Sequence, residues 1–194
     1  EDWKKDKNFT QSKCLDKFIA HCERKNLKFN HVLDVGAWVG TWTMKMNPFC
    51  GRVIAFEPDP IHYECLVKNL PDDVETHQLA VGNNKKMISL SEDDFTQAKR
   101  VIGDGTIPMV TIDSMNLNDI DLIKIDVEGY EMEVLKGAEN TLDNIEYLMI
   151  ELNNNAKKYG SSNLEIEKYL SKKGFKIMIK VWPDVVWQKK GKSK

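Results

Sequence analysis

Three charged residues alternate with apolar ones in the run DLIKIDVE, residues 121–128. Successive side chains of a strand point to opposite faces, so Lys124, Asp126 and Glu128 are predicted to share one face. Burying an unpaired ion costs several kcal/mol, so a central strand carries such a row only where it leaves the core at a site. Gly129 follows, and MEVLKGAENTL is typical of a helix. The row is therefore predicted at the strand-to-helix edge where open α/β sheets bind ligands.

The depth of each charge along this strand predicts a different task for it. Lys124 lies deepest, so we expect its ammonium group to pair with Asp34 or Asp126. Asp126 ends the strand and Glu128 lies at the rim, where a carboxylate can meet a bound molecule. Glu151 ends the later run IEYLMIEL and is predicted to reach the same edge. Three carboxylates at one edge also suit a hard divalent cation, which the sequence leaves open without favouring it.

The segments that position these residues alternate between short β-rich runs and helical runs. Ahead of the charged strand, their order is HVLDVGA, TWTMKMN, RVIAFEP, IHYECLVKNL and VETHQLAV. This βαβαβ pattern is typical of a doubly wound α/β fold with a parallel sheet and right-handed crossovers. Apolar spacing between Phe9 and Asn26 predicts an amphipathic helix before the first strand, which we expect to cap the sheet or a substrate pocket.

The alternation weakens over residues 82–110 and then resumes. In this stretch MISLSE is predicted as a short strand and GDGTIP as a loop, so we interpret it as an insertion near the ligand edge. Further on, helices are predicted over residues 130–142 and 164–173, on either side of the strand IEYLMIEL. FKIMIKV and DVVWQKK close the chain with only Trp182 and Pro183 near the turn. This predicts an antiparallel hairpin, because a parallel connection needs about a dozen residues.

The composition favours one globular domain. At 194 residues and 41% hydrophobic content, the chain can bury roughly 70% of its unfolded surface. We expect residues 1–30 to form an N-terminal helical cap and residues 31–194 the sheet domain. The 28 Lys plus Arg against 30 Asp plus Glu give a net charge of −2. The chain therefore has no overall positive field that would attract nucleic acid, and we expect no nucleic-acid partner. We interpret the terminal QKKGKSK as a solvated basic tail.

Cysteine spacing and hydropathy give expectations for the cellular compartment of the protein. The four cysteines show no CxxC spacing, which disfavours a zinc site and predicts a reduced, cytoplasmic protein. The chain has no run of about 18 apolar residues, so we predict no membrane span.

A glycine-containing turn, DVGAWVG, follows the first strand at residues 34–40. Gly36 allows a tight turn and a close approach of backbone to a ligand. Gly40 opens a helix whose N-terminal amides favour anionic or electron-rich groups. Taken alone, such a turn is also compatible with an ordinary strand-to-helix connection.

The end of the second strand adds a more specific signal. Glu57 follows RVIAF and is predicted to lie beside the turn, where a carboxylate can accept both hydroxyls of a ribose. At the end of the third strand, Ala80 and Val81 form a small apolar edge that can face a purine. The combination predicts a nucleoside ligand.

Two nucleoside cofactors place an acid at this position. A nicotinamide dinucleotide normally requires GxGxxG to bind its pyrophosphate. This turn has Trp38 and Val39 where that motif needs a second close glycine. S-adenosylmethionine carries no phosphate and can bind beside a bulky turn. The sheets of proteins that bind it usually end in an antiparallel hairpin. The pattern favours a methyl donor over an oxidoreductase.

The motifs VLDVGAWVG, FEPDP, LAVGN, TIDSM, LIKIDVEGYEMEVLKGA and IEL together resemble the FkbM-family methyltransferases. LIKIDVEGYE is the most specific of them. The resemblance implies a Rossmann-like class I methyltransferase fold, with a seven-stranded, mostly parallel sheet that ends in an antiparallel hairpin. It also implies an S-adenosylmethionine-dependent transferase that methylates a hydroxyl on a sugar or another small molecule.

The resemblance extends to individual positions. The residues expected to bind the cofactor are Asp34, Gly36, Ala37, Gly40, Glu57, Pro58, Ala80 and Val81. Those of the glycine turn meet the methionine portion, the acid meets the ribose, and the apolar pair meets the adenine. One position departs from the family, whose turns usually carry Asn where this chain has Trp38. We interpret that side chain as a lid or a substrate contact.

Methyl transfer from a sulfonium mainly requires alignment, and orientation supplies about 7 to 11 kcal/mol. A base near an acceptor hydroxyl adds roughly 10²- to 10⁴-fold in rate. Asp126 is the first candidate for this base, because it ends the strand next to the cofactor strand, and Glu128 and Glu151 complete the predicted catalytic set. The alternative is a catalytically weak or inactive nucleoside-binding module of the same fold.

Overall fold

The computed structural model describes residues 10–91 and 99–189. Residues 1–9 of the predicted cap and most of the basic tail lie outside the described residues. The large sheet consists of β1 (Phe29–Val35), β2 (Cys50–Phe56), β3 (Glu75–His77), β7 (Ile120–Ile125), β8 (Tyr147–Glu151), β9 (Phe175–Val181) and β10 (Asp184–Lys189). A small sheet consists of β4 (Ala80–Val81), β5 (Lys86–Leu90) and β6 (Val101–Val110).

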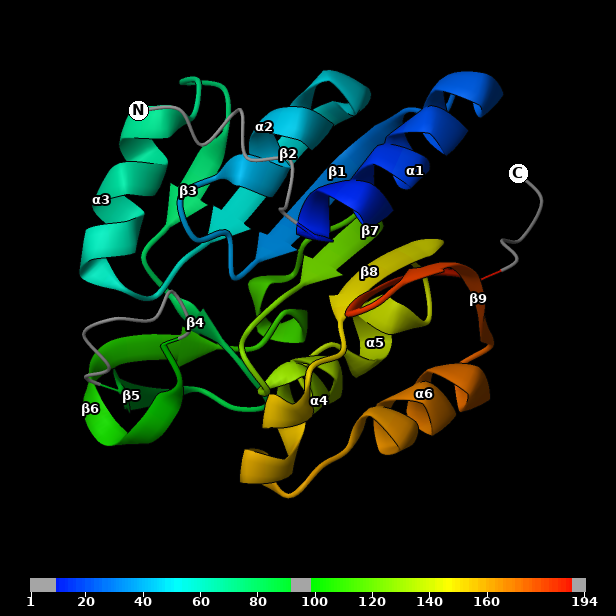
Figure 1. Ribbon diagram of the computed structural model, residues 1–194. Coiled ribbons are helices and arrows are strands. Elements are labelled where there is room, and N and C mark those ends of the chain that lie inside the picture. The colour runs from blue at the N-terminus through cyan, green and yellow to red at the C-terminus, as the bar shows by residue number, and fades with distance from the viewer. Residues whose placement is uncertain (1–9, 92–98, 190–194) are drawn as a thin grey trace.

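Helices cover both faces of the large sheet. They are α1 (Thr10–Lys25), α2 (Thr41–Met46), α3 (Pro60–Asn69), α4 (Glu131–Lys136), α5 (Glu139–Leu142) and α6 (Asn163–Lys172), with short 3-10 helices η2 (Asn47–Phe49), η3 (Asp113–Met115) and η4 (Asn154–Tyr159). Figure 1 shows α1, α2 and α3 on one side of the sheet and α4, α5 and α6 on the other. Among these helices, none is long and apolar enough to cross a membrane.

The strand order of the large sheet is β3-β2-β1-β7-β8-β10-β9. The first five strands pair in parallel, and β10 runs antiparallel to both β8 and β9. This arrangement confirms the predicted seven-stranded sheet and its C-terminal hairpin. Because β1 is central and the chain winds outward in both directions from it, the carboxyl ends of β1 and β7 lie at the topological switch point.

Two apolar clusters fill the space between the sheet and its helices. Phe18 of α1 and Trp42 of α2 belong to the cluster on one face, and Leu135 of α4 belongs to the cluster on the other. α1 packs against β9 and β10, and its described residues do not line the cavity at the ligand edge. The helix therefore covers the sheet, which was one of the two roles expected for it.

The charged strand divides its side chains between these clusters. Ile123 and Ile125 are fully buried in the cluster beneath α4 and α6, whereas Leu122 belongs to the cluster beneath α1 and α2. Lys124 lies on the same face as Leu122, by strand alternation. Both faces are covered, which is why the strand is apolar apart from this lysine and the partly exposed Asp121 near its start.

Four local predictions were wrong. VETHQLAV divides into β3 and β4, because β3 pairs with β2 whereas β4 pairs with β6 of the small sheet. GDGTIP lies within β6, since its pairing with β5 overrides the turn-forming glycines and proline. The helix predicted over residues 130–142 breaks into α4 and α5. At this break Gly137 lies so close to Gly82 that a Cβ would come 1.9 Å from the carbonyl oxygen of Gly82.

The fourth correction concerns the charged row itself. β7 ends at Ile125, and Glu128 has a left-handed backbone with φ 55°. Glu128 therefore does not continue the strand face of Lys124. A tight loop, not strand alternation, determines where its carboxylate lies.

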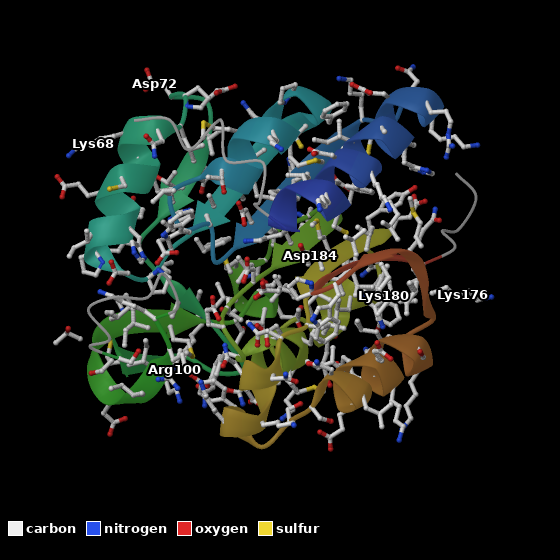
Figure 2. All side chains as sticks on the ribbon, viewed as in Figure 1. Lys68, Asp72, Arg100, Lys176, Lys180 and Asp184 are labelled. Carbon is white, nitrogen blue, oxygen red and sulfur yellow. The ribbon has the colours of Figure 1, made fainter. Side chains whose placement is uncertain are left out.

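Figure 2 contrasts buried and exposed charges around the hairpin. Lys176 and Lys180 lie on the exposed edge strand β9, where charges discourage pairing with another chain. Asp184 of β10 lies in the middle of the molecule and is 2% exposed.

Candidate functional site

A cavity of about 280 Å³ opens at the carboxyl ends of β1, β2, β7 and β8. The connections after β1, β2 and β7 contribute Gly36, Ala37, Trp38, Glu57, Pro58, Asp126, Val127 and Glu128 to its wall. His62 comes from α3, and Glu151 is the last residue of β8. The small sheet and its connections contribute Leu79, Ala80, Val81, Leu90, Lys99 and Val101. The structure thus brings most of the predicted site residues to one cavity.

Glu57 is held rigidly at the cavity wall. Its Oε2 accepts a hydrogen bond from the backbone N–H of Trp38 at 2.9 Å, and its Oε1 accepts one from the N–H of Asp59 at 2.9 Å. The residue is 6% exposed. Each carboxylate oxygen retains a further acceptor position, so the group is both oriented and able to accept two ligand hydroxyls.

Asp59 links the start of α3 to the small-sheet insertion. Its Oδ1 caps α3 by accepting from the N–H groups of Ile61 and His62, and its Oδ2 pairs with Lys99 Nζ at 2.5 Å. Burial alone would raise the pKa of Asp59, but the hydrogen bonds from Lys99 and the His62 amide hold it below its ordinary value. The insertion is therefore tied to the helix beside the cavity.

The sequence analysis did not identify Lys99 or His62 as residues of this wall. Lys99 lies forty positions from its partner Asp59, so no local spacing could reveal the pair. His62 Nδ1 lies 3.8 Å from Glu57 Oε1, although the sequence showed no partner for it. The only available signal for His62 was its place in the first turn of the helix that follows FEPDP.

The turn after β1 is as tight as its glycine implied. Gly36 has φ 79°, and a Cβ there would come 1.8 Å from the carbonyl oxygen of Asp126. Ala37 lies next to it on the cavity wall and donates its N–H to Phe56 O at 2.9 Å. Trp38 also has a left-handed backbone, with φ 51°.

Two residues of the predicted cofactor set lie behind the wall instead of on it. Asp34 is fully buried, where it accepts a hydrogen bond from Thr43 and pairs with Lys124. Gly40 opens α2, and a Cβ there would meet the side chain of Leu70 at 2.9 Å. In this structure both residues support the turn, and neither lines the cavity.

Lys124 pairs with both of its expected partners. Its Nζ lies 3.2 Å from Asp34 Oδ1 and 3.5 Å from Asp126 Oδ2, and it donates to Gly36 O at 2.6 Å. This confirms the structural task predicted for the lysine.

Asp126, Glu128 and Glu151 form a carboxylate cluster in which one oxygen of each lies within 4.8 Å of the others. The side-chain amide of Asn153 donates to Glu128 at 3.2 Å and to Glu151 at 2.9 Å. Asn155 donates to Glu128 at 3.0 Å. Amides and carboxylates therefore share one polar network at this end of the cavity.

Crowding changes the protonation of this cluster. Burial, followed by the charge of Asp126 and a hydrogen bond with it, raises the pKa of Glu151 to about 9. Burial and Asp126 also raise the pKa of Glu128. Near neutral pH Glu151 is therefore a proton donor, and the cluster favours an added positive charge. Its oxygen donors also have the chemistry that a hard divalent cation requires.

The strand order and the cavity at the switch point define a Rossmann-like class I methyltransferase fold. The chain belongs to the FkbM methyltransferase family, because the sequence pattern of the methyltransferase FkbM domain matches residues 34–177.

Individual proteins extend this comparison. The hexuronic acid methyltransferase AglP of Haloferax volcanii is 28% identical over 130 residues, which cover 61% of this chain and 54% of that protein. A crystal structure of methyltransferase FkbM from Methylobacillus flagellatus KT has a TM-score of 0.57 at 19% identity, covering 82% of this chain and 43% of that one. This chain thus spans about half the length of these relatives.

A further solved structure matches nearly the whole fold. The N-methyltransferase NodS of Bradyrhizobium japonicum WM9, in complex with S-adenosyl-L-homocysteine, has a TM-score of 0.56 at 11% identity. The match covers 97% of this chain and 91% of NodS. At this identity, the likeness concerns the fold.

Proposed function

We propose that the protein is an S-adenosylmethionine-dependent methyltransferase that transfers the methyl group to a hydroxyl of a small molecule, with a sugar as the favoured acceptor class. The observation that carries this proposal is one continuous cavity with a fixed carboxylate, Glu57, near one end and the cluster of Asp126, Glu128 and Glu151 near the other. Membership of the FkbM family supports the same conclusion.

The nucleoside half of the cavity fits the proposed cofactor. Glu57 is oriented to accept the ribose hydroxyls, and Pro58 continues the wall beside it. Ala80 and Val81 are small and at most 4% exposed, which suits contact with the face of a purine. Adjacent strands lie about 4.8 Å apart, so a ligand anchored after β2 has to span about 10 Å to reach the loop after β7.

When bound, S-adenosylmethionine supplies a methyl group on a positively charged sulfur. The protein then has to hold the acceptor oxygen in line with that methyl group and receive the hydroxyl proton. We assign the proton to Asp126, which lines the cavity directly after β7. The acceptor oxygen would gain the methyl group as it gives its proton to Asp126, and S-adenosylhomocysteine would remain as the second product.

Glu128 and Glu151 are proposed to bind the acceptor. Glu151 carries a proton near neutral pH and can donate it in a hydrogen bond, whereas the Glu128 carboxylate, held by Asn153 and Asn155, can accept one. Paired donors and acceptors of this kind suit the neighbouring hydroxyls of a sugar. The relative described as a hexuronic acid methyltransferase supports a sugar acceptor.

Calorimetry with S-adenosylmethionine tests the cofactor half of the proposal. We expect the native protein to bind it and Glu57→Ala to weaken binding by at least tenfold, because each charge-assisted hydrogen bond contributes about 1.5 to 3 kcal/mol. Glu64→Ala is the matched control, since Glu64 lies on the exposed side of α3 and forms a surface ion pair with Lys68. No binding by the native protein, or equal binding by the Glu57 variant, would contradict the proposal.

The acceptor half needs a second measurement. S-adenosylhomocysteine release is followed with a panel of neutral sugars, amino sugars and hexuronic acids. We expect turnover with a sugar and a loss of roughly 10²- to 10⁴-fold in Asp126→Asn, the range for removal of a general base. Cofactor binding without turnover of any acceptor would instead favour a nucleoside-binding module.

A further inference from the structure

Glu131 is a buried carboxylate that takes no part in the proposed chemistry. It begins α4 and is 1% exposed. An acid in the first turn of a helix usually offsets the helix dipole. Its side chain instead turns back toward the loop between β7 and α4, and it is not part of the cavity wall.

The carboxylate of Glu131 holds two backbone amides of that loop. Its Oε1 accepts a hydrogen bond from Gly129 N at 2.9 Å and a longer one from Val127 N at 3.3 Å. Amides bound to a buried carboxylate make charge-assisted hydrogen bonds, which are roughly twice as strong as neutral ones.

The loop has two consecutive residues with positive φ, a conformation that is unfavourable for a non-glycine residue. Glu128 has φ 55° although it is not a glycine, and Gly129 has φ 108°. Non-glycine residues in the left-handed region cost roughly 1 to 2 kcal/mol, so something has to hold this conformation. The amides on either side of Glu128 are the ones that Glu131 binds.

A second contact closes the loop from the opposite side. A Cβ at Gly129 would come 2.6 Å from the backbone carbon of Asn155, so the loop and the start of η4 are in close contact. Asn155 also donates its side-chain amide to Glu128 Oε2 at 3.0 Å. The loop is therefore held between a carboxylate on α4 and a residue of η4.

We propose that Glu131 is a positioning residue, whose carboxylate fixes the 127–129 loop so that Glu128 reaches the cavity beside Asp126 and Glu151. The consequence for acceptor binding rests on the proposed function. The positioning of Glu128 is a property of the protein alone and is testable without any ligand.

The titration of Glu131 is consistent with this role. Burial raises its pKa to about 7, with Asp126 acting in the same direction, while the Gly129 and Val127 amides and its own amide act in the opposite direction. Tyr159 also lies near enough to interact with its charge. Amide shifts at Gly129 should thus include a carboxyl titration that Glu131→Gln removes, beside any contribution from the neighbouring Glu128.

Hydrogen exchange tests the loop directly. In Glu131→Met, we expect exchange at Gly129 to accelerate about 10- to 100-fold, the loss expected from one charged hydrogen bond, with a smaller change at Val127. Amides of the core strands, such as that of Ile123, should keep their native rates. Glu131→Gln retains an accepting carbonyl and should restore most of the protection at Gly129.

Glu133→Met provides the matched control on the same helix. Glu133 binds Asn83 and Lys136 instead of the loop, so its loss should leave exchange at Gly129 unchanged. The position of Glu128 is followed through the side-chain amide resonances of Asn153 and Asn155. These resonances should move in Glu131→Met and return in Glu131→Gln.

A uniform acceleration of exchange, with the Asn153 and Asn155 resonances in place, would assign Glu131 a general structural role and overturn the proposal. If Glu131→Met does not fold, a pH titration of the Gly129 amide shift that is the same in the native protein and in Glu131→Gln would overturn it as well. Calorimetry with S-adenosylmethionine is read separately. Absence of binding there would count against the proposed function and not against the loop assignment.

Discussion

Lys124 and Asp34 are register partners on the parallel strands β7 and β1, and their side chains form an ion pair 3.2 Å long that is almost fully buried. Thr43 donates to the other oxygen of Asp34, and Lys124 reaches on to Gly36 O and Asp126. Burial would lower the pKa of Lys124, but Asp34 and Asp126 keep it raised. One charged ammonium group therefore connects the core, the turn after β1 and the cavity wall.

Lys124→Met should be strongly destabilising, because it leaves Asp34 buried without its partner. Breaking one side of a buried pair costs about 3 to 5 kcal/mol. The free energy of unfolding, measured with denaturant, checks this. In Lys45→Met, which removes an exposed pair with Asp16, the loss should be about 1 kcal/mol or less. Similar losses in the two variants would show that burial of the Lys124 pair has no special weight.

Gly36→Ala should be among the most damaging single-methyl additions in the chain. A Cβ at Gly36 would overlap the carbonyl of Asp126, whereas a Cβ at Gly160 would meet nothing within 4 Å. Both glycines have positive φ, so Gly160→Ala measures the backbone penalty alone, about 1 to 2 kcal/mol. We expect Gly36→Ala to exceed about 4 kcal/mol in denaturant unfolding. Equal losses would mean that the close approach is relieved at little cost.

Glu151→Gln should change how stability depends on pH. The pKa of Glu151 is raised from 4.5 to about 9, so between these values the unfolded chain binds fewer protons than the folded one. Native stability therefore falls as pH rises from about 5 to about 9. A glutamine does not titrate, so the difference in unfolding free energy between the variant and the native protein should move steadily in favour of Glu151→Gln across this range. Denaturant unfolding at several pH values measures it, and a pH-independent difference would contradict the raised pKa.

Trp38→Asn distinguishes the role of the Trp38 backbone from that of its indole ring. Asn tolerates a left-handed backbone well, and the N–H that donates to Glu57 remains. We expect the affinity for S-adenosylmethionine to stay close to the native value in calorimetry. A loss of tenfold or more would show that the indole ring, which packs edge-on against His62, contacts the cofactor directly.

Strand patterns predicted most of the large sheet. The apolar runs that became β1, β2, β7 and β8 each carried enough local signal, and the short Trp182–Pro183 connection was sufficient to predict an antiparallel hairpin. The small sheet was missed in part, because β6 contains Gly103, Gly105 and Pro108, which are typical of a loop. Its pairing with β5 depends on contacts that no short window of sequence contains.

In the candidate site too, residues placed by local sequence patterns could be predicted, whereas residues placed by contacts between distant segments could not. Glu57, Asp126 and Glu151 follow strands and could be assigned to one edge from topology alone, because parallel strands end together. Lys99 and Asn155 could not, since each meets its partner across a distance in sequence of more than twenty residues. Asp34 was placed on the correct strand and as one of two expected partners of Lys124, but the sequence did not show that it lies behind the cavity wall, because burial depends on which helix covers it.

The sequence by itself determined the order of the strands in the large sheet along the chain, the position of Glu57, Asp126 and Glu151 near strand ends and the membership of the family, because these depend on periodicity and on local motifs. Only the tertiary structure decided that Glu128 leaves the strand through a left-handed loop, that Glu131 binds that loop, and that Lys124 pairs with both Asp34 and Asp126 instead of one of them. Those relations arise from packing between distant segments, where burial and charge pairing set the position and protonation of each carboxylate.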